Sequence, residues 1–229
     1  MKRSHVAALI VFVLLIPATL YLGSQLSGRS YYITGTLIIL EMLIPFFMAF
    51  EGRKPQAREL VLVAVMCALA IVGRIAIPIP HFKAAFAIIM LAGMVFGPET
   101  GFMVDAITAL VSNFFYGQGP YTPWQMMSYG AGGMLAGFLF ARGRLPRTDW
   151  VMALVGFFTV VLWVGPLMDC ASIFLLITEI NVTSVMGVFL SGLYVNLLQA
   201  ASTAVVLMFF GKPILKKLER VQMKYGMIE

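Results

Sequence analysis

The sequence predicts an all-α, polytopic membrane protein. Of its 229 residues, 61% are hydrophobic and only 11% are charged, whereas soluble domains carry about 25% charged residues. The mean hydropathy of +0.94 extends over the whole chain, and a soluble domain of this size could not bury so much apolar surface. A succession of apolar runs of membrane-spanning length is the third observation. No long polar stretch is present that could form a separate soluble domain.

Eight apolar segments are expected to form helices, because about 20 helical residues, at ~1.5 Å each, cross a bilayer core of ~30 Å. They cover about residues 6–23, 32–50, 59–77, 84–96, 101–116, 124–141, 150–179 and 184–211. The first follows Lys2 and Arg3, as a signal peptide would. Because a second apolar segment follows and no small-x-small cleavage site is evident, we expect a retained helix.

The linkers between these segments divide the chain. Residues 51–59 form the one strongly charged linker, and they separate two N-terminal helices from the remaining six. The fourth and fifth segments are short and are separated only by residues 97–100. The seventh is too long for one straight span, and Gly165-Pro166 predicts a kink in it. We therefore expect two N-terminal transmembrane helices with their linker (1–57), a six-helix core (58–212) and a basic tail (213–229).

The distribution of basic residues predicts the topology. When the N-terminus is placed in the cytoplasm, only Arg29, Arg74 and Lys83 of the 16 Lys and Arg residues fall on the outer side. The positive-inside rule therefore predicts a multi-pass protein of a bacterial-type plasma membrane with both termini in the cytoplasm. The tail from Lys212 is expected to lie at lipid headgroups. This topology accounts for the net charge of +6 without nucleic acid as a partner.

Motifs for several kinds of chemistry are absent from the sequence. It contains no G-x-x-x-x-G-K-[ST] phosphate loop, so ATP hydrolysis is not expected. It also lacks H-E-x-x-H and G-x-S-x-G, and its two histidines and two cysteines fall in no cluster with metal-ligand spacing. We therefore expect no catalytic residue, no metal and no cofactor. An intramembrane enzyme that uses Asp105 or Asp169 stays open as an alternative.

Polar residues line one face of two predicted helices. At the spacing i, i+4, i+7 and i+11, which places residues on one face, the fifth segment carries Gly101, Asp105, Thr108 and Ser112, and the last carries Gly192, Asn196, Gln199 and Thr203. Because lipid cannot satisfy such groups, the two faces either line a shared cavity or form interhelical hydrogen bonds worth ~0.6 kcal/mol on average. Both interpretations stay open for Asp105, whereas Asn196 and Gln199 favour the cavity. Asp169, near the predicted outer side, either contacts a ligand or caps its segment.

The outer turn between the fifth and sixth segments carries many hydrogen-bonding side chains. Its sequence "FFYGQGPYTPWQMMSYGAGG" holds Tyr116, Tyr121 and Trp124 together with two prolines, which restrict the backbone. Aromatic rings with a polar edge suit a ligand that is part ring and part amide. An interfacial aromatic belt would explain the rings, but it explains the amides Asn113, Gln118 and Gln125 less well. The turn therefore predicts a ligand site.

With these features, the last six segments resemble the S component, the substrate-binding membrane subunit, of energy-coupling factor (ECF) vitamin transporters. "AVMCALA" is similar to the Ala-x-x-x-Ala first core helix of that family. "FGPETGFMVDAITAL" is similar to its Gly-x-x-x-Gly-x-x-x-Asp passage between the second and third core helices. The Gly/Pro outer turn also fits, as does the Gly-rich fourth helix, where Gly133 and Gly137 permit close backbone approach. The resemblance covers about residues 58–212.

The resemblance implies an import mechanism. An S component binds its vitamin near the outer face, associates with a transmembrane coupling subunit and two cytoplasmic ATPases, and topples in the membrane to deliver the ligand inward. Ala64 and Ala68 would face the coupling subunit. The outer loop 77–82 would gate the pocket through Pro78, Pro80, His81 and Phe82. The two N-terminal helices depart from the usual six-helix pattern.

The resemblance also bears on the substrate. The "GQGPYTPWQM" pattern most resembles the branch that includes cobalamin S components, so cobalamin or a related corrinoid is expected, with a thiamine precursor or a queuosine precursor as alternatives. The residues expected to bind it are Asn113, Tyr116, Gln118, Tyr121, Trp124, Gln125, Asp169, Asn196 and Gln199. The expected partners are the vitamin, the coupling subunit, the two ATPases and the bilayer. A membrane scaffold subunit with no small-molecule ligand stays open as a function of another class.

Overall fold

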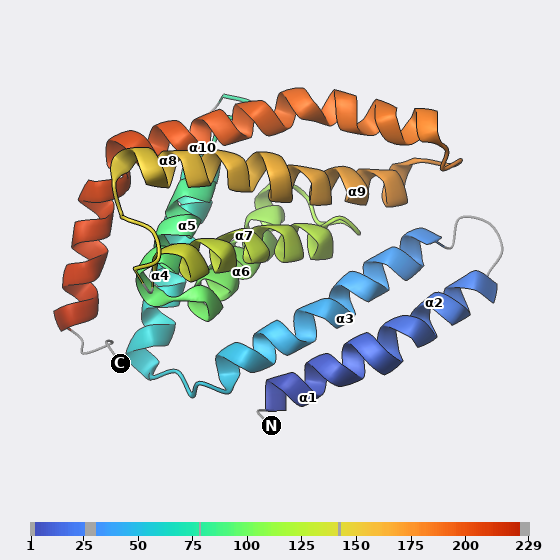
Figure 1. Cartoon of the computed structure of the whole chain (residues 1–229), viewed down its shortest axis with the longest axis horizontal. Helices are drawn as coiled ribbons and strands as arrows, with labels where there is room; N and C mark the ends of the chain where they lie inside the picture. The colour runs from blue at the N-terminus through green and yellow to red at the C-terminus, as the bar shows by residue number, and fades with distance from the viewer. Residues whose placement is uncertain (1–2, 26–30, 78, 142, 225–229) are drawn as a thin grey trace.

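The computed structural model describes residues 3–25, 31–77, 79–141 and 143–224. Within these ranges every regular element is helical, so the all-α prediction is confirmed (Figure 1). The helices are α1 (Arg3–Ile10), α2 (Ile16–Gln25), α3 (Tyr31–Glu51), α4 (Ala57–Ile75), α5 (Ala85–Phe96), α6 (Pro98–Tyr116), α7 (Thr122–Phe140), α8 (Asp149–Thr159), α9 (Gly165–Leu176) and α10 (Val182–Lys224).

The described helices correspond to the eight predicted segments, since α1 continues into α2 and α8 continues into α9. The largest difference is at the end of α10, which passes the predicted end at residue 211, contains Pro213 and reaches Lys224. Its last part turns away from the rest of the helix (Figure 1). Four described segments are long and apolar enough to cross a membrane, namely Val6–Gly23, Ile33–Glu51, Asp149–Leu176 and Val182–Lys224.

Two π-helical turns accommodate prolines inside long helices. Val160–Val164 joins α8 to α9 immediately before Gly165-Pro166, and Val11–Leu15 joins α1 to α2 before Pro17. A proline ring clashes with the carbonyl four residues before it in a regular α-helix. The wider turn, in which Gly165 N–H donates to Val160 O, relieves this clash while the helix continues. The structure therefore has a π-helical turn where the sequence predicts a kink.

Glycines bring α5, α6 and α7 into backbone contact. A Cβ atom at Gly101 would lie 2.6 Å from Gly133 O and 2.7 Å from Gly93 Cα. A Cβ atom at Gly137 would lie 2.5 Å from Pro98 Cα, at the start of α6. The close approach predicted for Gly133 and Gly137 is therefore confirmed. The α5–α6 junction is a single residue, Gly97, whose φ of 93° suits glycine.

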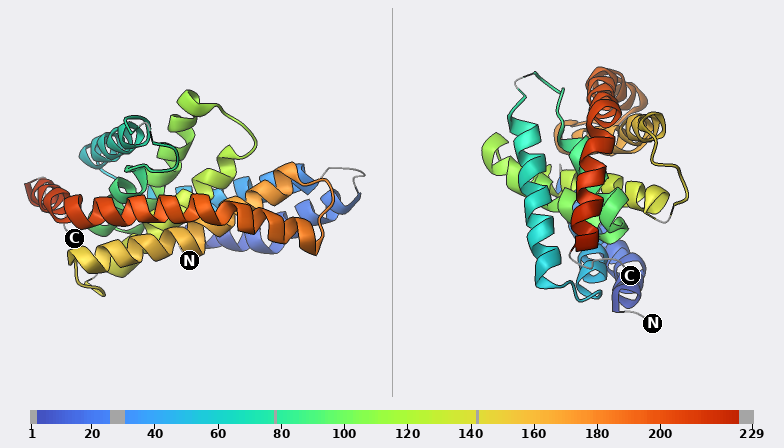
Figure 2. Two further views of the ribbon diagram at one scale, coloured as in Figure 1. Left: turned by 90° about the horizontal axis from the view of Figure 1, so that it is seen from above. Right: turned by 90° about the vertical axis from the view of Figure 1, so that its left-hand side faces the viewer.

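The remaining core helices cover this contact. Helices α8 and α9 lie beside α10, and α4 runs across their long direction (Figures 1 and 2). The buried face of α4, which includes Val63, Met66 and Cys67, packs against α5 and α6. On the other face of α4, Ala64 and Ala68 are exposed.

The two N-terminal helices form a hairpin that packs on the core through α3. Helix α3 contacts α6, α7 and α9. Its residue Gly35 is buried, and a Cβ atom there would lie 3.2 Å from the Trp124 ring and 3.5 Å from the Phe174 ring. Within the hairpin, the Thr19 hydroxyl donates to Glu41. The N-terminal pair is therefore packed against the six-helix core.

We predict that Gly133→Ala lowers the free energy of unfolding by about 1–3 kcal/mol, because the added methyl group overlaps Asp105 Oδ2 and Gly101 O in a tightly packed contact. Thermal unfolding of the purified protein in detergent measures this change. Gly187→Ala is the matched control, since a Cβ atom at Gly187 has nothing within 4 Å. Equal melting temperatures for the two variants would contradict the role of the glycine contact.

Candidate ligand-binding site

A half-buried arginine lies where the end of α4 meets the end of α6. The Arg74 guanidinium donates to Asn113 Oδ1 at 3.2 Å and, through the same nitrogen, to the Ser112 hydroxyl. It lies over the ring of Tyr116, 4.9 Å from the centroid, and the Tyr116 hydroxyl donates to Arg74 O at 2.9 Å. The C-terminal turn of α6 is thereby tied to the end of α4.

The amides of the outer turn form one hydrogen-bonded network. Asn113 is fully buried, and its Nδ2 donates to Gln125 Oε1 at 2.7 Å and to Thr122 Oγ1 at 3.1 Å. Thr122 in turn donates to Gln118 Oε1 at 2.9 Å, and Gln118 Nε2 donates to Leu110 O at 2.8 Å. The structure therefore brings together the three amides of the turn, as the sequence analysis expects for a site, and connects them to Arg74 through Asn113.

The aromatic residues of the turn do not all join this network. Tyr116 stacks under Arg74, while the Tyr121 hydroxyl donates to Gly117 O within the turn. Trp124 lies on another side of α7, stacked on Phe174 of α9 with ring centroids 5.5 Å apart, and it is covered by Gly35 of α3. Its side chain is 6% exposed, and its Nε1 has no hydrogen-bond partner among the described residues.

A second polar group lies between α9 and α10. Asn196 Nδ2 donates to Asp169 Oδ2 at 2.9 Å, and both side chains are buried. Gly192 lies against the Asp169 carboxylate, and a Cβ atom at Gly165 would lie 2.5 Å from Asn196 Cγ, so small residues provide the space for this pair. Gln199 lies one turn further along α10, where its carbonyl accepts hydrogen bonds from the hydroxyls of Ser202 and Thr203.

Side chains of α5 and α7 connect the two polar groups. Tyr129 lies with its ring centroid 5.9 Å from the Arg74 guanidinium and 4.7 Å from the Phe86 ring. One residue before it, the buried Ser128 hydroxyl donates to Val164 O at 3.1 Å, next to Gly165 and therefore to Asn196. Tyr129 of α7 therefore lies near the Arg74 group, and Ser128 lies near the Asp169–Asn196 pair.

The loop expected to gate the site is hydrogen-bonded to α4 and α10 at its C-terminal end, just before α5. Ala84 N–H donates to Gly73 O at 3.2 Å, and the Ser202 hydroxyl donates to Lys83 O at 3.0 Å. The loop therefore lies between the end of α4 and the middle of α10. Of its expected gating residues, Pro80 and His81 are exposed and Phe82 is partly buried, while Pro78 lies outside the described residues.

Asp105 takes no part in either polar group. It is fully buried at the glycine contact between α6 and α7, against Gly133, and neither carboxylate oxygen has a hydrogen-bond partner among the described side chains and backbone groups. The residues that share its helix face, Thr108 and Ser112, are also fully buried. The predicted polar face of this helix is therefore buried against protein.

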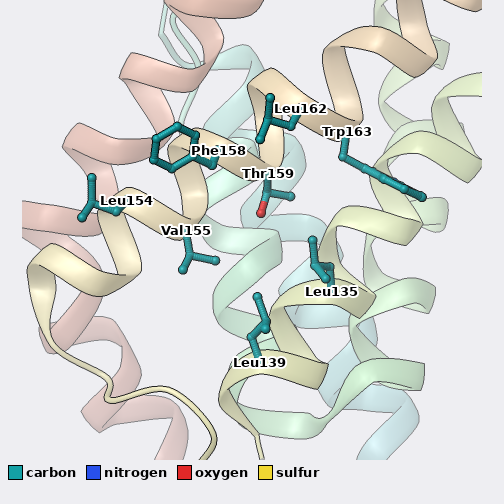
Figure 3. Close-up of a pocket in the computed structure, with 8 residues that line it drawn as sticks. All are labelled: Leu135, Leu139, Leu154, Val155, Phe158, Thr159, Leu162 and Trp163. Atoms are coloured by element: carbon teal, nitrogen blue, oxygen red, sulfur yellow. The ribbon is translucent and has the colours of Figure 1, made fainter.

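Two described pockets lie on apolar outer faces of the helices. One, of about 320 Å³, opens between α7 and the α8 helix with its π-helical turn (Figure 3), and its lining residues are Leu135, Leu139, Leu154, Val155, Phe158, Thr159, Leu162 and Trp163. The other, of about 340 Å³, lies along α3 beside Met126. Neither is lined by any of the predicted substrate-binding residues, so the hydrogen-bonded groups, and not these pockets, define the candidate site.

Arg74, Ser128 and Tyr129 are not among the site residues predicted from the sequence. A signal for Arg74 was present, because it is one of only three basic residues on the predicted outer side. Ser128 and Tyr129 had no such signal, since they lie inside an apolar, glycine-rich helix whose orientation depends on its neighbours.

Comparisons with known proteins identify the family. No curated protein and no solved structure matches the chain. The family model described as "ECF-type riboflavin transporter, S component" matches residues 54–217, which includes the expected core at 58–212. The chain therefore belongs to the family of ECF-type riboflavin transporter S components, and it is a multi-pass membrane protein that serves as the substrate-binding subunit of an ECF importer.

Proposed function

We propose that the chain captures one vitamin molecule at two polar groups, one formed by α4, α6 and α7 and the other by α9 and α10. The observation that carries this proposal is the pair of hydrogen-bonded polar groups, around Arg74–Asn113–Gln125 and Asp169–Asn196, in helices that are otherwise apolar. Interhelical hydrogen bonds contribute only ~0.6 kcal/mol on average in membranes. Stability alone therefore gives little reason to concentrate so many polar groups in one region, whereas a ligand with amide and ring edges needs donors and acceptors there.

The family match does not by itself identify the vitamin that this chain binds. The family model is of the riboflavin type and does not support the expectation of cobalamin, which rests on the resemblance of the outer turn. We propose riboflavin as the first candidate, because the Tyr116 and Tyr129 rings near Arg74, with the Phe86 ring packed against Tyr129, suit a flat ring system with polar edges. A corrinoid is the second candidate, and the "GQGPYTPWQM" turn is the observation that favours it. Mass spectrometry of the small molecule retained by the purified chain distinguishes the two.

The proposed partners are a transmembrane coupling subunit and two cytoplasmic ATPases, with both termini of the chain in the cytoplasm. Ala64 and Ala68 support a docking role for α4, because both are exposed on the face opposite its buried residues. The N-terminal hairpin contacts α6, α7 and α9 and leaves these two alanines uncovered. Capture of the ligand and docking of the coupling subunit would therefore take place on different faces of the protein.

We predict that Gln125→Ala weakens binding of the retained vitamin by about 10-fold, because Asn113 Nδ2 loses one of its two acceptors and the network at Arg74 loosens. Isothermal titration calorimetry with the purified protein measures the dissociation constant. Gln56→Ala, which removes an exposed amide before α4, is the matched control and should bind as the unaltered chain does. Unchanged affinity in Gln125→Ala would remove the outer-turn network from the site.

We also predict that Ala64→Trp abolishes uptake of the vitamin but leaves binding intact, because an indole on the exposed face of α4 blocks close helix approach. Uptake of labelled vitamin into cells that carry the coupling subunit and ATPases measures transport, and binding to the purified chain is measured in parallel. Leu154→Trp, at an exposed position of α8, controls for added bulk. Normal uptake by Ala64→Trp would exclude docking through this face.

A further inference from the structure

The pocket between α7 and α8, the α7–α8 groove, takes no part in the candidate ligand-binding site. It has a volume of about 320 Å³ and lies on an outer face of the helices (Figure 3). Of its eight lining residues, only Thr159 and Trp163 carry a polar side-chain atom. Four large apolar side chains of this lining are exposed, namely Leu154, Phe158, Leu162 and Trp163. A groove with such a lining suits a hydrocarbon chain.

The length of the α7–α8 groove matches one leaflet of a bilayer. Along α8 and the π-helical turn that follows it, the lining begins at Leu154 and ends at Trp163. Helical residues at ~1.5 Å each give this stretch a length of about 14 Å, which is close to half of a hydrocarbon core of ~30 Å. Because α8 begins at Asp149, at the predicted inner end, the groove lies in the half of the membrane on that side.

An exposed cation lies at the inner end of the α7–α8 groove. Arg144, in the loop between the two helices, donates from Nη1 to Phe138 O at 3.4 Å, and Phe138 directly precedes Leu139 of the lining. Among the described residues, no carboxylate oxygen lies within 4.0 Å of Arg144, whereas Arg147 of the same loop is paired with Glu219. Arg144 therefore places a positive charge without an acidic partner at the end of the groove.

An exposed tryptophan marks the headgroup level at the same end. Trp150 lies in the first turn of α8, one helical turn before Leu154 of the lining. Tryptophan side chains are enriched where the hydrocarbon core meets the lipid headgroups. A lipid whose acyl chain lies in the groove would therefore have its headgroup at the level of Trp150, where the loop with Arg144 joins α8.

The other described pocket, along α3, provides a comparison because it has the opposite charge at its inner end. Its volume of about 340 Å³ and its largely apolar lining are similar, but the lining includes Glu51, the last residue of α3. Glu51 is exposed and forms no ion pair with the described basic side chains. An anionic headgroup is repelled there, whereas it is attracted at Arg144. The two pockets therefore differ in charge more than in size.

We propose that the α7–α8 groove binds an acyl chain of an anionic phospholipid from the leaflet at the predicted inner side, with Arg144 donating hydrogen bonds to the lipid phosphate. The planar fork of a guanidinium matches two phosphate oxygens, and such charge-assisted hydrogen bonds are the strong ones. The cytoplasmic leaflet is also the one that carries anionic lipid. This lipid site is separate from the candidate vitamin site, so the inference does not depend on the identity of the vitamin.

Quenching of tryptophan fluorescence by brominated lipids tests the proposal, because Trp163 lies in the groove. The full-length chain carries Trp150→Phe, so that the exposed Trp150 does not contribute, and Trp124 gives a constant background because it is buried under α3. This reporter chain is placed in dioleoylphosphatidylcholine vesicles that contain increasing fractions of dibrominated phosphatidylglycerol or, for comparison, dibrominated phosphatidylcholine. We expect phosphatidylglycerol to reach half-maximal quenching at an about 5-fold lower fraction, the effect of one basic residue near the membrane surface.

Variants of the reporter chain separate this site from general attraction to the membrane surface. Arg144→Gln should remove the preference for phosphatidylglycerol, and so should Val155→Phe, which fills the groove without changing charge. Arg58→Gln removes an exposed cation at the start of α4, which packs on α5 and α6, and should keep the preference. Leu40→Trp, combined with Trp163→Phe, moves the reporter to the pocket along α3, where we expect no preference for phosphatidylglycerol.

The possible outcomes decide between the explanations. Loss of the preference in Arg144→Gln and Val155→Phe, with Arg58→Gln unaffected, supports the proposal. Equal quenching by the two lipids in the reporter chain overturns it, as does a preference that survives Arg144→Gln or Val155→Phe. A preference that Arg58→Gln also loses reflects the overall charge of the inner surface, and the proposal is then wrong. If neither lipid quenches Trp163, protein covers the groove in the membrane, which likewise overturns the proposal. None of these outcomes bears on the proposed vitamin site.

Discussion

Backbone contact between α6 and α7 is the constraint on which the rest of the core depends. Gly101 and Gly133 allow the two helices to touch, with Gly93 of α5 and the Asp105 side chain filling the same contact. The short connection from Tyr116 to Thr122 joins the same helices at their other ends, where Asn113 donates to Gln125. The pair is therefore fixed at two points, about 18 Å apart along α6, and its relative rotation is determined. That rotation aims Asn113 at Gln125 and Thr122, and it sets Ser128 and Tyr129 toward α9 and α5.

A feature could be predicted from the sequence where it depends on neighbouring residues, and it could not be predicted where it depends on residues far away in the chain. Hydropathy and helix length depend on neighbouring residues, so the helical segments could be predicted within a few residues, except for the end of α10, which continues from the predicted residue 211 to Lys224. The polar spacing on α6 correctly indicated one face, because Asp105, Thr108 and Ser112 are all fully buried. The direction of Trp124 could not be predicted, because it depends on the position of α3, which is far away in the sequence. Successive residues of a helix point about 100° apart, so Gln125 faces Asn113 while Trp124 faces Phe174 and Gly35.

The N-terminal hairpin is part of the folded unit although the family match begins only at residue 54. Its helix α3 places Gly35 against the stacked rings of Trp124 and Phe174, and Ile39 and Leu43 join the same apolar cluster as Phe86 and Tyr129. The hairpin thus supports the predicted outer end of α7 from a different side than the Asn113 network does. Because the start of α7 carries residues of the candidate site, the additional helices bear on the geometry of that site through packing and not through polar contacts of their own.

Basic side chains have different kinds of partner at the two predicted ends of the helix bundle. At the predicted inner end, Arg53 pairs with Glu59 and Glu99, Arg147 pairs with Glu219, and Lys212 pairs with Asp149. The Arg53 pairs join the starts of α4 and α6, and the other two pairs join α10 to α8 and to the loop before it. Partly exposed ion pairs of this kind contribute about 0–1 kcal/mol each. Their main effect is therefore to fix the helix ends relative to one another. At the predicted outer end, Arg74 is held by the oxygens of Ser112 and Asn113 instead. Because a neutral acceptor orients a guanidinium without cancelling its field, Arg74 is held in place while its positive charge has no acidic partner among the described residues.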